Sequence, residues 1–552
     1  MSRYALGLDF GTESGRALLV DISDGREVAT AIHPYPHGVV DEQLPDGGPR
    51  LEPDWALQDP DDYWAVLEVV VPEVLRQSGA SADEVIGIGV DFTACTLLPV
   101  LADGTPLSRL PEHRQQPHAW GKLWKHHAAQ PEAERINELA AERGESFLAR
   151  YGGKTSSEWL FAKAWQLLDE APELYDRAER LVEAGDWLVW QLTGREVRSA
   201  CQAGYKGMWS RSEGYPSAEF LAALHPRLAS LPEEKLRGEV LPVGARAGEL
   251  TEAAARRLGL RPGTAVAVSL IDAHAGVPAA GVSGPGKMLL ILGTSCCHLV
   301  LGQEEKSFEG IAGVVQDGIL PGFLGYEAGQ PATGDILAWH TRHALPAAYA
   351  REAEDRGVSP HQVLVEKAAT LRPGETGLLA LDWWNGNRSV LMDADLSGAL
   401  IGLTLDTRAE DIYRALIEGT AFGTRAILEN FARNGVEVEE IIAAGGLSEK
   451  NELLMQIYAD VTGRPIRLAR SGQACALGAA ILGAVAAGEA DGGYGDLPTA
   501  VERMGGVKER CYTPDPAAHE LYSQLFREWM RLHDYFGRGG NEVLKTLRAL
   551  RG

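Results

Sequence analysis

Short apolar runs and longer helix-like stretches follow one another along this chain. Residues 4–9 form an apolar run that ends in an acid, residues 10–15 form a turn rich in Gly, Thr and Ser, and residues 16–22 form a second apolar run. Two such runs around a short turn predict a β-hairpin. Residues 288–301 repeat this arrangement around Gly-Thr-Ser. Similar units in the two halves of the chain predict an internal duplication.

The rest of the pattern predicts strands that alternate with helices. Buried strands are expected at 85–91 and 265–271, where Asp91 and Asp272 mark the strand ends. The other predicted strands are 378–381 and 441–446, and the predicted helices are 60–77, 131–150, 157–170, 185–193, 332–343, 411–433, 450–462 and 473–488. Strands interleaved with helices indicate an α/β fold.

A Gly- and Pro-rich turn at 281–286 predicts a boundary between two domains, 1–283 and 284–510. The last segment, 511–552, is expected to be a helical tail that packs on the surface. The length of 552 residues gives enough chain for two full cores.

Charge and composition narrow the classes of function. Asp and Glu total 77 against 52 Lys and Arg, a net charge of −25. Nucleic acid and anionic membranes need a basic protein surface, so we expect neither as a partner. The six cysteines form no C-x-x-C pair, no apolar run reaches the roughly 18 residues of a membrane helix, and no signal segment opens the chain. A cytoplasmic protein is expected. Because its net charge is negative, any bound phosphate must be held by local groups, such as backbone N–H groups, a Lys or a metal.

The two hairpin turns are candidate phosphate-binding elements. Gly11, Thr12 and Ser14 offer a close-approaching backbone, hydroxyls and N–H groups, and Gly293 and Thr294 repeat this offer. The same residue types are common in plain hairpin turns. Their repetition favours two turns that bind a polyphosphate between them. The chain has neither a Walker loop nor a Rossmann fingerprint.

Three further positions carry candidate chemistry. Asp9, at a strand end, is suited to hold Mg²⁺ directly or through water. Asp272 is either a general base for an attacking hydroxyl or the N-cap of a helix, with equal weight from spacing alone. Gly445 and Gly446 follow a predicted strand and let an adenine lie on the backbone, although a strand-to-helix turn capped by Ser448 explains them equally well.

Residues 113–127 alternate indoles with polar hydrogen-bonding groups, which suits a hydroxyl-rich ligand. Taken alone, the segment is better explained as an exposed amphipathic helix.

Several long segments, together with these turns, resemble the FGGY carbohydrate kinases, and within that family the ribulokinases. The segments that carry the closer resemblance are 89–99, 151–159, 183–194, 203–209, 325–330, 382–389 and 451–460. The family resemblance implies a two-lobed fold of the actin and sugar-kinase type, built from duplicated ribonuclease-H-like domains with the active site in the cleft between lobes.

The resemblance also implies an activity and a set of site residues. The activity is ATP- and Mg²⁺-dependent phosphorylation of O5 of L-ribulose in arabinose catabolism, with tolerance for related ketopentoses, by an enzyme that is a homodimer in the family. It implies the following roles: Asp272 as the general base; Asp9 for Mg²⁺; Thr12, Gly293 and Thr294 for the ATP phosphates; Gly445, Gly446 and Asn451 for the adenosine; and Trp124, Lys206, Asp272 and Glu327 for the sugar, with Ala94 at the wall of its site.

Three alternatives stay open. One is another kinase of the family that acts on xylulose, glycerol or gluconate. A second is a chaperone-type ATPase, which would need a peptide-binding β domain where this chain has a short tail. A third is a sugar-sensing protein without catalysis, against which Asp9, Thr12 and Asp272 argue.

Overall fold

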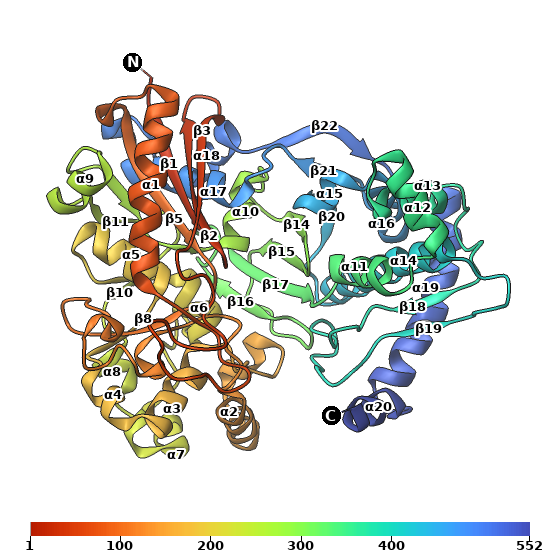
Figure 1. Cartoon of the computed structure of the whole chain (residues 1–552), viewed down its shortest axis with the longest axis horizontal. Coiled ribbons are helices and arrows are strands. Elements are labelled where there is room, and N and C mark those ends of the chain that lie inside the picture. The colour runs from red at the N-terminus through yellow and green to blue at the C-terminus, as the bar shows by residue number, and fades with distance from the viewer. Residues whose placement is uncertain (1, 552) are drawn as a thin grey trace.

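Two large β-sheets organise the molecule, which we describe from a computed structural model that covers residues 2–551 (Figure 1). The first sheet has seven strands, mostly coloured red and orange at the left of the view. Its strands are β1 (Tyr4–Phe10), β2 (Ser14–Asp21), β3 (Arg26–Pro34), β5 (Val85–Phe92), β11 (Arg246–Glu249), β12 (Ala265–Ala267) and β13 (Leu270–Ile271). The path runs β11-β12-β5-β1-β2-β3, with β13 beside β5.

The second sheet also has seven strands and lies at the right of the view. Its strands are β14 (Gly286–Leu292), β15 (Cys296–Gly302), β16 (Gly313–Gln316), β17 (Leu324–Gln330), β20 (Val438–Ala444), β21 (Ile466–Ala469) and β22 (Val507–Tyr512), and the path runs β16-β17-β15-β14-β20-β21-β22.

Both sheets share one pairing scheme. The opening hairpin, β1–β2 or β14–β15, continues into a third antiparallel strand, β3 or β17. On the other side, the first strand pairs in parallel with β5 or β20. The predicted α/β class and internal duplication are confirmed.

Helices cover the sheets and explain the near-continuous apolar character of the central strands. All eight residues of β5 are buried, because α1 (Pro60–Ser78) packs on one part of the sheet and α17 (Ala474–Ala487) packs directly on β5 and β1. The predicted strand 265–271 is divided into β12 and β13, and between them the Ser269 hydroxyl turns to donate a 2.6 Å hydrogen bond to Asp186.

Helix α17, from the second half of the sequence, crosses onto the first sheet. A Cβ added to Gly89 of β5 would lie 1.8 Å from the Ala479 carbonyl oxygen of α17. A Cβ on Gly478 would lie equally close, 1.8 Å, to the Ala275 carbonyl oxygen of α10 (Asp272–Ala279). Backbone therefore touches backbone on both sides of α17, which only glycine permits. This close packing ties the two halves together between the sheets.

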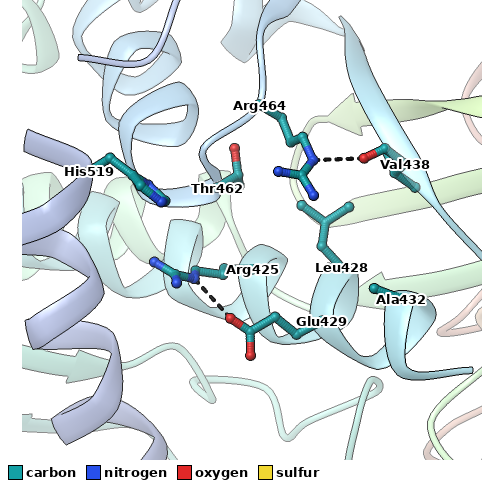
Figure 2. Close-up of a pocket in the computed structure, with 8 residues that line it drawn as sticks. All are labelled: Arg425, Leu428, Glu429, Ala432, Val438, Thr462, Arg464 and His519. Atoms are coloured by element: carbon teal, nitrogen blue, oxygen red, sulfur yellow. Dashed lines mark hydrogen bonds and ion pairs between the residues drawn. The ribbon is translucent and has the colours of Figure 1, made fainter. Parts of the chain in front are cut away.

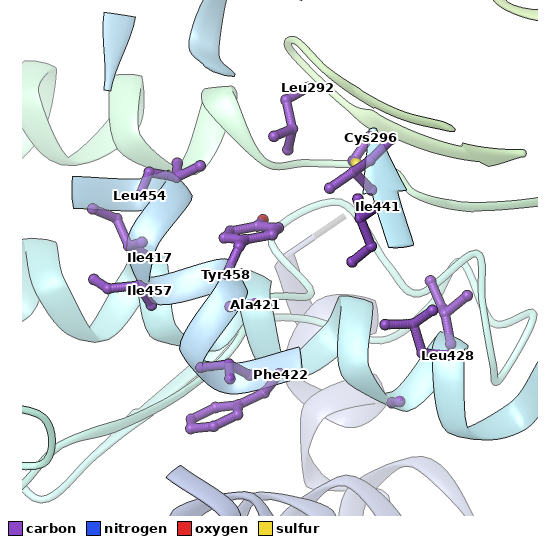
Figure 3. Close-up of a cluster of buried hydrophobic side chains, with 14 of the residues drawn as sticks. Leu292, Cys296, Ile417, Ala421, Phe422, Leu428, Ile441, Leu454, Ile457 and Tyr458 are labelled. Atoms are coloured by element: carbon purple, nitrogen blue, oxygen red, sulfur yellow. The ribbon is translucent and has the colours of Figure 1, made fainter. Parts of the chain in front are cut away.

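The core of the second half is built from α14 (Ala409–Arg433), α16 (Glu452–Thr462) and the inner strands (Figure 3). Ile417 and Phe422 from α14 meet Ile457 and Tyr458 from α16, and Ile441 of β20 closes the cluster. Each is at most 2% exposed, and burying one such side chain contributes about 1.5–3 kcal/mol.

The C-terminal tail packs on the second half through one helical face, and that face is part of this core. Helix α19 (Pro516–Gly537) buries Tyr522, Phe526 and Trp529 at helical spacing, and the Trp529 indole N–H donates a 2.8 Å hydrogen bond to the Ala380 carbonyl. The expected start of the tail, residue 511, lies inside β22 of the second sheet. The chain ends with α20 (Val543–Arg551).

A smaller four-stranded sheet lies next to the first large sheet and is built from β4 (Leu57–Gln58), β7 (Gly121–Lys122), β6 (Leu97–Val100) and β8 (Arg180–Glu183). The helix considered for 113–127 is wrong, because the segment holds only a short 3₁₀ turn, Pro117–Ala119, and β7. Its Trp120, Lys122 and His126 are buried, so packing inside the protein explains why indoles and polar groups alternate in this segment.

The remaining two-stranded sheets are β9 (Val197–Ser199) with β10 (Glu239–Leu241) and β18 (Leu379–Leu381) with β19 (Ala399–Ile401). The other helices are α2 (Gln130–Arg143), α3 (Leu160–Glu170), α4 (Pro172–Arg177), α5 (Ala184–Thr193), α6 (Ala200–Gly207), α7 (Ala218–Leu224), α8 (Leu231–Lys235), α9 (Glu252–Leu258), α11 (Gly334–His343), α12 (Ala347–Arg356), α13 (Pro360–Ala368), α15 (Gly446–Lys450) and α18 (Leu497–Met504). Among residues 2–551, no helix is both long and apolar enough to span a membrane.

Candidate active site

Three acids stand side by side at the carboxyl edge of the first sheet. Asp9 of β1 is in register with Asp91 of β5, and Asp91 is in register with Leu270 of β13. Asp272 follows β13 directly as the first residue of α10. In open α/β sheets this edge is where ligands bind.

The two inner acids, Asp9 and Asp91, disfavour each other's negative charge. Burial raises the pKa of Asp9, while the Arg16 guanidinium, 3.2 Å from its carboxylate, opposes the shift. Asp91 is fully buried, and burial together with the charges of Asp9 and Asp272 raises its pKa well above the usual range. Within residues 2–551, neither carboxylate oxygen of Asp91 has a hydrogen-bond partner. Adjacent acidic oxygens with unused acceptor capacity fit a hard cation such as Mg²⁺.

Asp272 has the protonation behaviour of a general base. Its carboxylate is partly accessible, yet burial by the surrounding protein, and next the charge of Asp9, raise its pKa to about 7. The α10 N-cap is Ile271, so the alternative N-cap role of Asp272 does not hold; its carboxylate instead accepts a 2.6 Å bond from the Ala273 N–H.

A buried ion pair joins the two halves near Asp272. Lys206 of α6 lies 3.3 Å from Glu327 of β17, and His274 Nε2 lies 3.4 Å from the same carboxylate. Burial by itself would raise the pKa of Glu327, but Lys206, His274 and Arg388 together outweigh burial and the net shift is downward. Burial would lower the pKa of Lys206, but Glu327, Cys95 and Glu158 together outweigh it and the net shift is upward. The pair is therefore charged, and it offers both an acceptor and a donor to a hydroxylated ligand.

Trp124 and Ala94 border the same region. The Trp124 indole N–H donates a 3.0 Å hydrogen bond to the Thr12 hydroxyl, which links the predicted sugar side to the first hairpin. Ala94 is half-buried in the turn after β5. Beneath this turn, the buried Lys163 ammonium donates to the carbonyls of Cys95 (2.5 Å), Leu123 (2.8 Å) and Lys122 (3.2 Å).

Four of the predicted nucleotide residues, Gly293, Thr294, Gly445 and Gly446, lie at the carboxyl edge of the second sheet, whereas Gly11, Thr12 and Ser14 lie in the first hairpin. Gly293 and Thr294 follow β14, and their carbonyls accept bonds of 3.0 and 2.9 Å from the N–H groups of Gly334 and Thr333 at the start of α11. Because Ile291 and Ala444 are in register, Gly445 and Gly446 leave β20 next to this turn. Gly445 has φ of 96°, and its Cβ would lie 2.4 Å from the Leu292 carbonyl oxygen.

Three other predicted nucleotide residues already have structural tasks. The Asn451 side chain caps α16 by accepting a 3.0 Å bond from the Leu454 N–H. The carbonyl of Ser14 accepts a 3.0 Å bond from the Gly11 N–H, which closes the first hairpin turn. The nucleotide roles of Asn451, Ser14 and Gly11 stay predictions.

Side chains of both sheets meet at this junction. Cys297 of β15 lies three residues after Thr294, and its thiol is influenced by Arg388, Glu327, Asp272 and Lys206, although burial is the main reason its pKa rises to about 11. The structure thus brings the predicted sugar residues together across the two halves.

The sequence analysis missed four residues of this region: Asp91, Lys163, His274 and Arg388. Asp91 was visible as an acid closing a predicted strand, and His274 stood two positions after Asp272. No sequence signal marks Lys163, whose partners lie 40 to 68 positions away.

A separate cavity of about 200 Å³ lies at the far ends of β20 and α16 from the predicted nucleotide residues (Figure 2). Arg425 and Arg464 face it, but their N–H groups already serve the carbonyls of Val461 (3.1 Å) and Val438 (2.7 Å). The two arginines therefore have a structural role at this cavity, which is to satisfy carbonyl groups at the ends of these elements.

Comparison with known proteins gives the family. The models for the N-terminal and C-terminal domains of the FGGY family of carbohydrate kinases match residues 4–278 and 288–487. The chain is 57% identical to a ribulokinase of Geobacillus thermodenitrificans over 546 residues, covering 99% of this chain and 97% of the relative. It is 57% identical to a ribulokinase of Shouchella clausii over 551 residues, covering 100% and 98%.

Solved structures give the same result. A xylulose kinase of Rhodospirillum rubrum superposes with a TM-score of 0.78 at 26% identity, covering 96% of this chain and 98% of that one. Two domain models that span most of the sequence, and relatives that match it end to end, agree with the duplicated sheets described above. The chain therefore belongs to the FGGY family of carbohydrate kinases.

Proposed function

We propose that this kinase transfers the γ-phosphoryl group of ATP to O5 of L-ribulose, giving L-ribulose 5-phosphate and ADP. The curated relatives at 57% identity carry the name ribulokinase. The observation that carries the mechanism is Asp272, a partly accessible carboxylate with a pKa of about 7 beside the charged Lys206–Glu327 pair.

Asp272 accepts the proton of the sugar hydroxyl as O5 bonds to the γ-phosphorus. The bond from that phosphorus to the β–γ bridging oxygen breaks, and ADP leaves with the electron pair. A base whose pKa lies near the working pH is the most effective, and such assistance gives about 10²–10⁴-fold. Asp272 also holds the hydroxyl in line for displacement, which is the main task of a protein in phosphoryl transfer.

Lys206 and Glu327 bind and orient the sugar. The Lys206 ammonium donates to a sugar oxygen, and Glu327 accepts from hydroxyl groups. Trp124 and Ala94 limit the space beside them. Because all of these groups are fixed by the packing of the two halves, little reorganisation is needed on binding.

The hairpins and the glycine turns hold the nucleotide. The N–H groups and hydroxyls around Thr12 and Thr294 take the phosphates, and Gly445 and Gly446 leave room for the adenosine. Mg²⁺ bound with ATP offsets phosphate charge, and Asp9 and Asp91 are the residues suited to hold it. In this proposal the two turns bind the phosphates and the two acids bind the metal. These local groups are needed because the protein as a whole has a net charge of −25.

The test is an ADP-release assay with L-ribulose, D-ribulose, L-xylulose and D-xylulose. We expect the highest kcat/KM with L-ribulose and a product phosphorylated at O5, as identified by NMR. Solved relatives of this fold include xylulose kinases. A preference for a xylulose, or ADP release that is independent of sugar, would overturn the proposal.

A further inference from the structure

Arg388 is a fixed cationic side chain next to the Lys206–Glu327 pair. It lies after β18, in a segment attached to β17 by two reciprocal hydrogen bonds. The Ser389 N–H donates to the Gly329 carbonyl at 3.1 Å, and the Gly329 N–H donates to the Ser389 hydroxyl at 3.2 Å. The backbone at Arg388 is thus held against the strand that carries Glu327.

The Arg388 side chain lies over the same face of β17 as Glu327. A Cβ added to Gly329 would lie 3.2 Å from Arg388 Cδ and 3.3 Å from its Nη1. Gly329 and Glu327 are two positions apart on one strand, so they face the same side. On the neighbouring strand, Cys297 is directly opposite Gly329. Glycine at position 329 therefore makes the room that the guanidinium occupies.

The guanidinium has no partner of its own. Across residues 2–551, no carboxylate oxygen lies within 4.0 Å of Arg388, and its neighbours act on it only through charge. Burial would lower its pKa, whereas Cys297, Glu158 and Glu327 act in the other direction and the net shift is upward. By contrast, the buried Arg414 is satisfied by Glu418 at 2.8 Å and by the Tyr522 hydroxyl at 2.9 Å.

A half-buried guanidinium without a partner in the protein has N–H donors available to a ligand that supplies acceptors. Its surroundings indicate which ligand. Glu158 and Cys95, from the predicted sugar side, and Glu327 are the groups that act on it with Cys297. Gly329, which the Arg388 side chain covers, is two positions from Glu327 on the same face of β17. Arg388 therefore lies beside the Glu327 end of the Lys206–Glu327 pair.

We propose that Arg388 is a sugar-binding residue, whose guanidinium donates hydrogen bonds to oxygens of the ketopentose that lie beside Glu327. This inference rests on the proposed function and deepens it. Arg388 adds to Lys206 and Glu327 a third charged contact, which selects pentuloses by the position of these oxygens.

The test compares Arg388→Gln and Arg388→Lys with the matched surface variant Arg467→Gln, whose arginine pairs with Glu440 at 3.1 Å. We expect Arg388→Gln to raise the KM for L-ribulose and its Kd, measured by calorimetry without ATP, by 10-fold to 100-fold. The KM for ATP stays within twofold, and Arg388→Lys recovers part of the sugar affinity. A thermal unfolding midpoint equal to wild type shows that the fold is intact.

Two outcomes would overturn the inference. One is unchanged sugar Kd in Arg388→Gln; the other is a fall in kcat with unchanged sugar Kd, which would assign Arg388 to the transferred phosphoryl group. Should the fold of that variant weaken, Gly329→Ala supplies the second test. Its Cβ would lie 3.2 Å from Arg388 Cδ and 3.0 Å from the Cys296 carbonyl oxygen, so it shifts the Arg388 side chain and is expected to raise the sugar Kd about threefold to tenfold, with the unfolding midpoint measured in parallel. Failure of the wild-type enzyme to bind L-ribulose would reject the proposed function itself, and the Arg388 comparison would then be made with the pentulose that binds.

Discussion

The carboxyl edges of the two large sheets have the same topology and opposite chemistry. At the edge of the first sheet, β1, β5 and β13 present Asp9, Asp91 and Asp272. At the edge of the second, β14 and β20 present glycine turns at Gly293 and Gly445. One edge therefore offers negative side chains, and the other offers backbone groups that a ligand can approach closely. A duplicated scaffold supplies equivalent positions, and the residue types at the strand ends make the two edges chemically different.

The largest effect is expected from removing the charge of the base on the acidic edge. Asp272→Asn keeps the size of the side chain but cannot accept the O5 proton, so kcat should fall about 10²–10⁴-fold. Binding of L-ribulose, measured by calorimetry, should change by less than tenfold, because Lys206 and Glu327 remain. The exposed Asp83→Asn is the control. A kcat within threefold of wild type would remove Asp272 from the role of base.

The pH profile tests the same edge without a mutation. The pKa of Asp272 is raised to about 7, and only the deprotonated form accepts a proton. Activity should therefore be complete above this pKa and fall about tenfold per pH unit below it, or about 100-fold at pH 5. The measurement is kcat/KM against pH with saturating ATP, with unfolding followed in parallel. A profile that is flat between pH 5 and 8 contradicts the assignment.

Lys163 supports the sugar side of the acidic edge from beneath. Lys163→Met leaves three buried carbonyls, those of Cys95, Lys122 and Leu123, without their shared donor. The Leu123 carbonyl keeps a 3.0 Å bond from the His126 N–H, but each carbonyl that is left unsatisfied costs about 1–3 kcal/mol, so the urea midpoint should fall clearly. The KM for sugar should rise about tenfold, since the turn at Ala94 and the segment at Trp124 lose their common anchor.

The control for this substitution is Lys508→Met, whose ammonium pairs with Glu449 at the surface. Equal urea midpoints for Lys163→Met and Lys508→Met would show that the buried ammonium does not anchor these two segments.

The smallest effect, and the sharpest comparison, concerns the glycine edge. In Gly445→Ala the new Cβ would clash with the Leu292 carbonyl oxygen, and the alanine would have to adopt a φ of 96°. The substitution should therefore lower the free energy of unfolding by about 1–3 kcal/mol. Gly446→Ala has no atom within 4 Å of its new Cβ and begins α15, so its stability should be equal or slightly higher. Urea denaturation of both variants gives the comparison. A similar loss in both would show that the backbone at position 445 is not the constraint.

Local pattern predicted much of this molecule. The alternation of apolar runs, glycine turns and acids identified both hairpins, the strand that ends at Asp91 and the long helix observed as α14, because these signals repeat within a few residues. The resemblance of long segments supplied the family and the candidate residues Lys206 and Glu327, which the structure places 3.3 Å apart.

Other features depended on contacts between residues distant in sequence, and only the folded structure decided them. The tail looked peripheral, yet Trp529 is completely buried, since one apolar stripe does not reveal what it packs against. Residues 113–127 have alternating polar and aromatic groups but no helix, because their packing around β7 outweighs local preference.

The sequence by itself determined where strands end and which of them carry an acid or a glycine, since side-chain period and turn chemistry are local properties. The tertiary structure decided that Asp9, Asp91 and Asp272 become neighbours, that α17 lies on the sheet of the other half, that Lys163 joins the segments at Cys95 and Leu123, and that Arg388 lies over β17. Register, close backbone approach and the burial of charge arise from pairs of segments that are tens to hundreds of residues apart, and no local pattern encodes them.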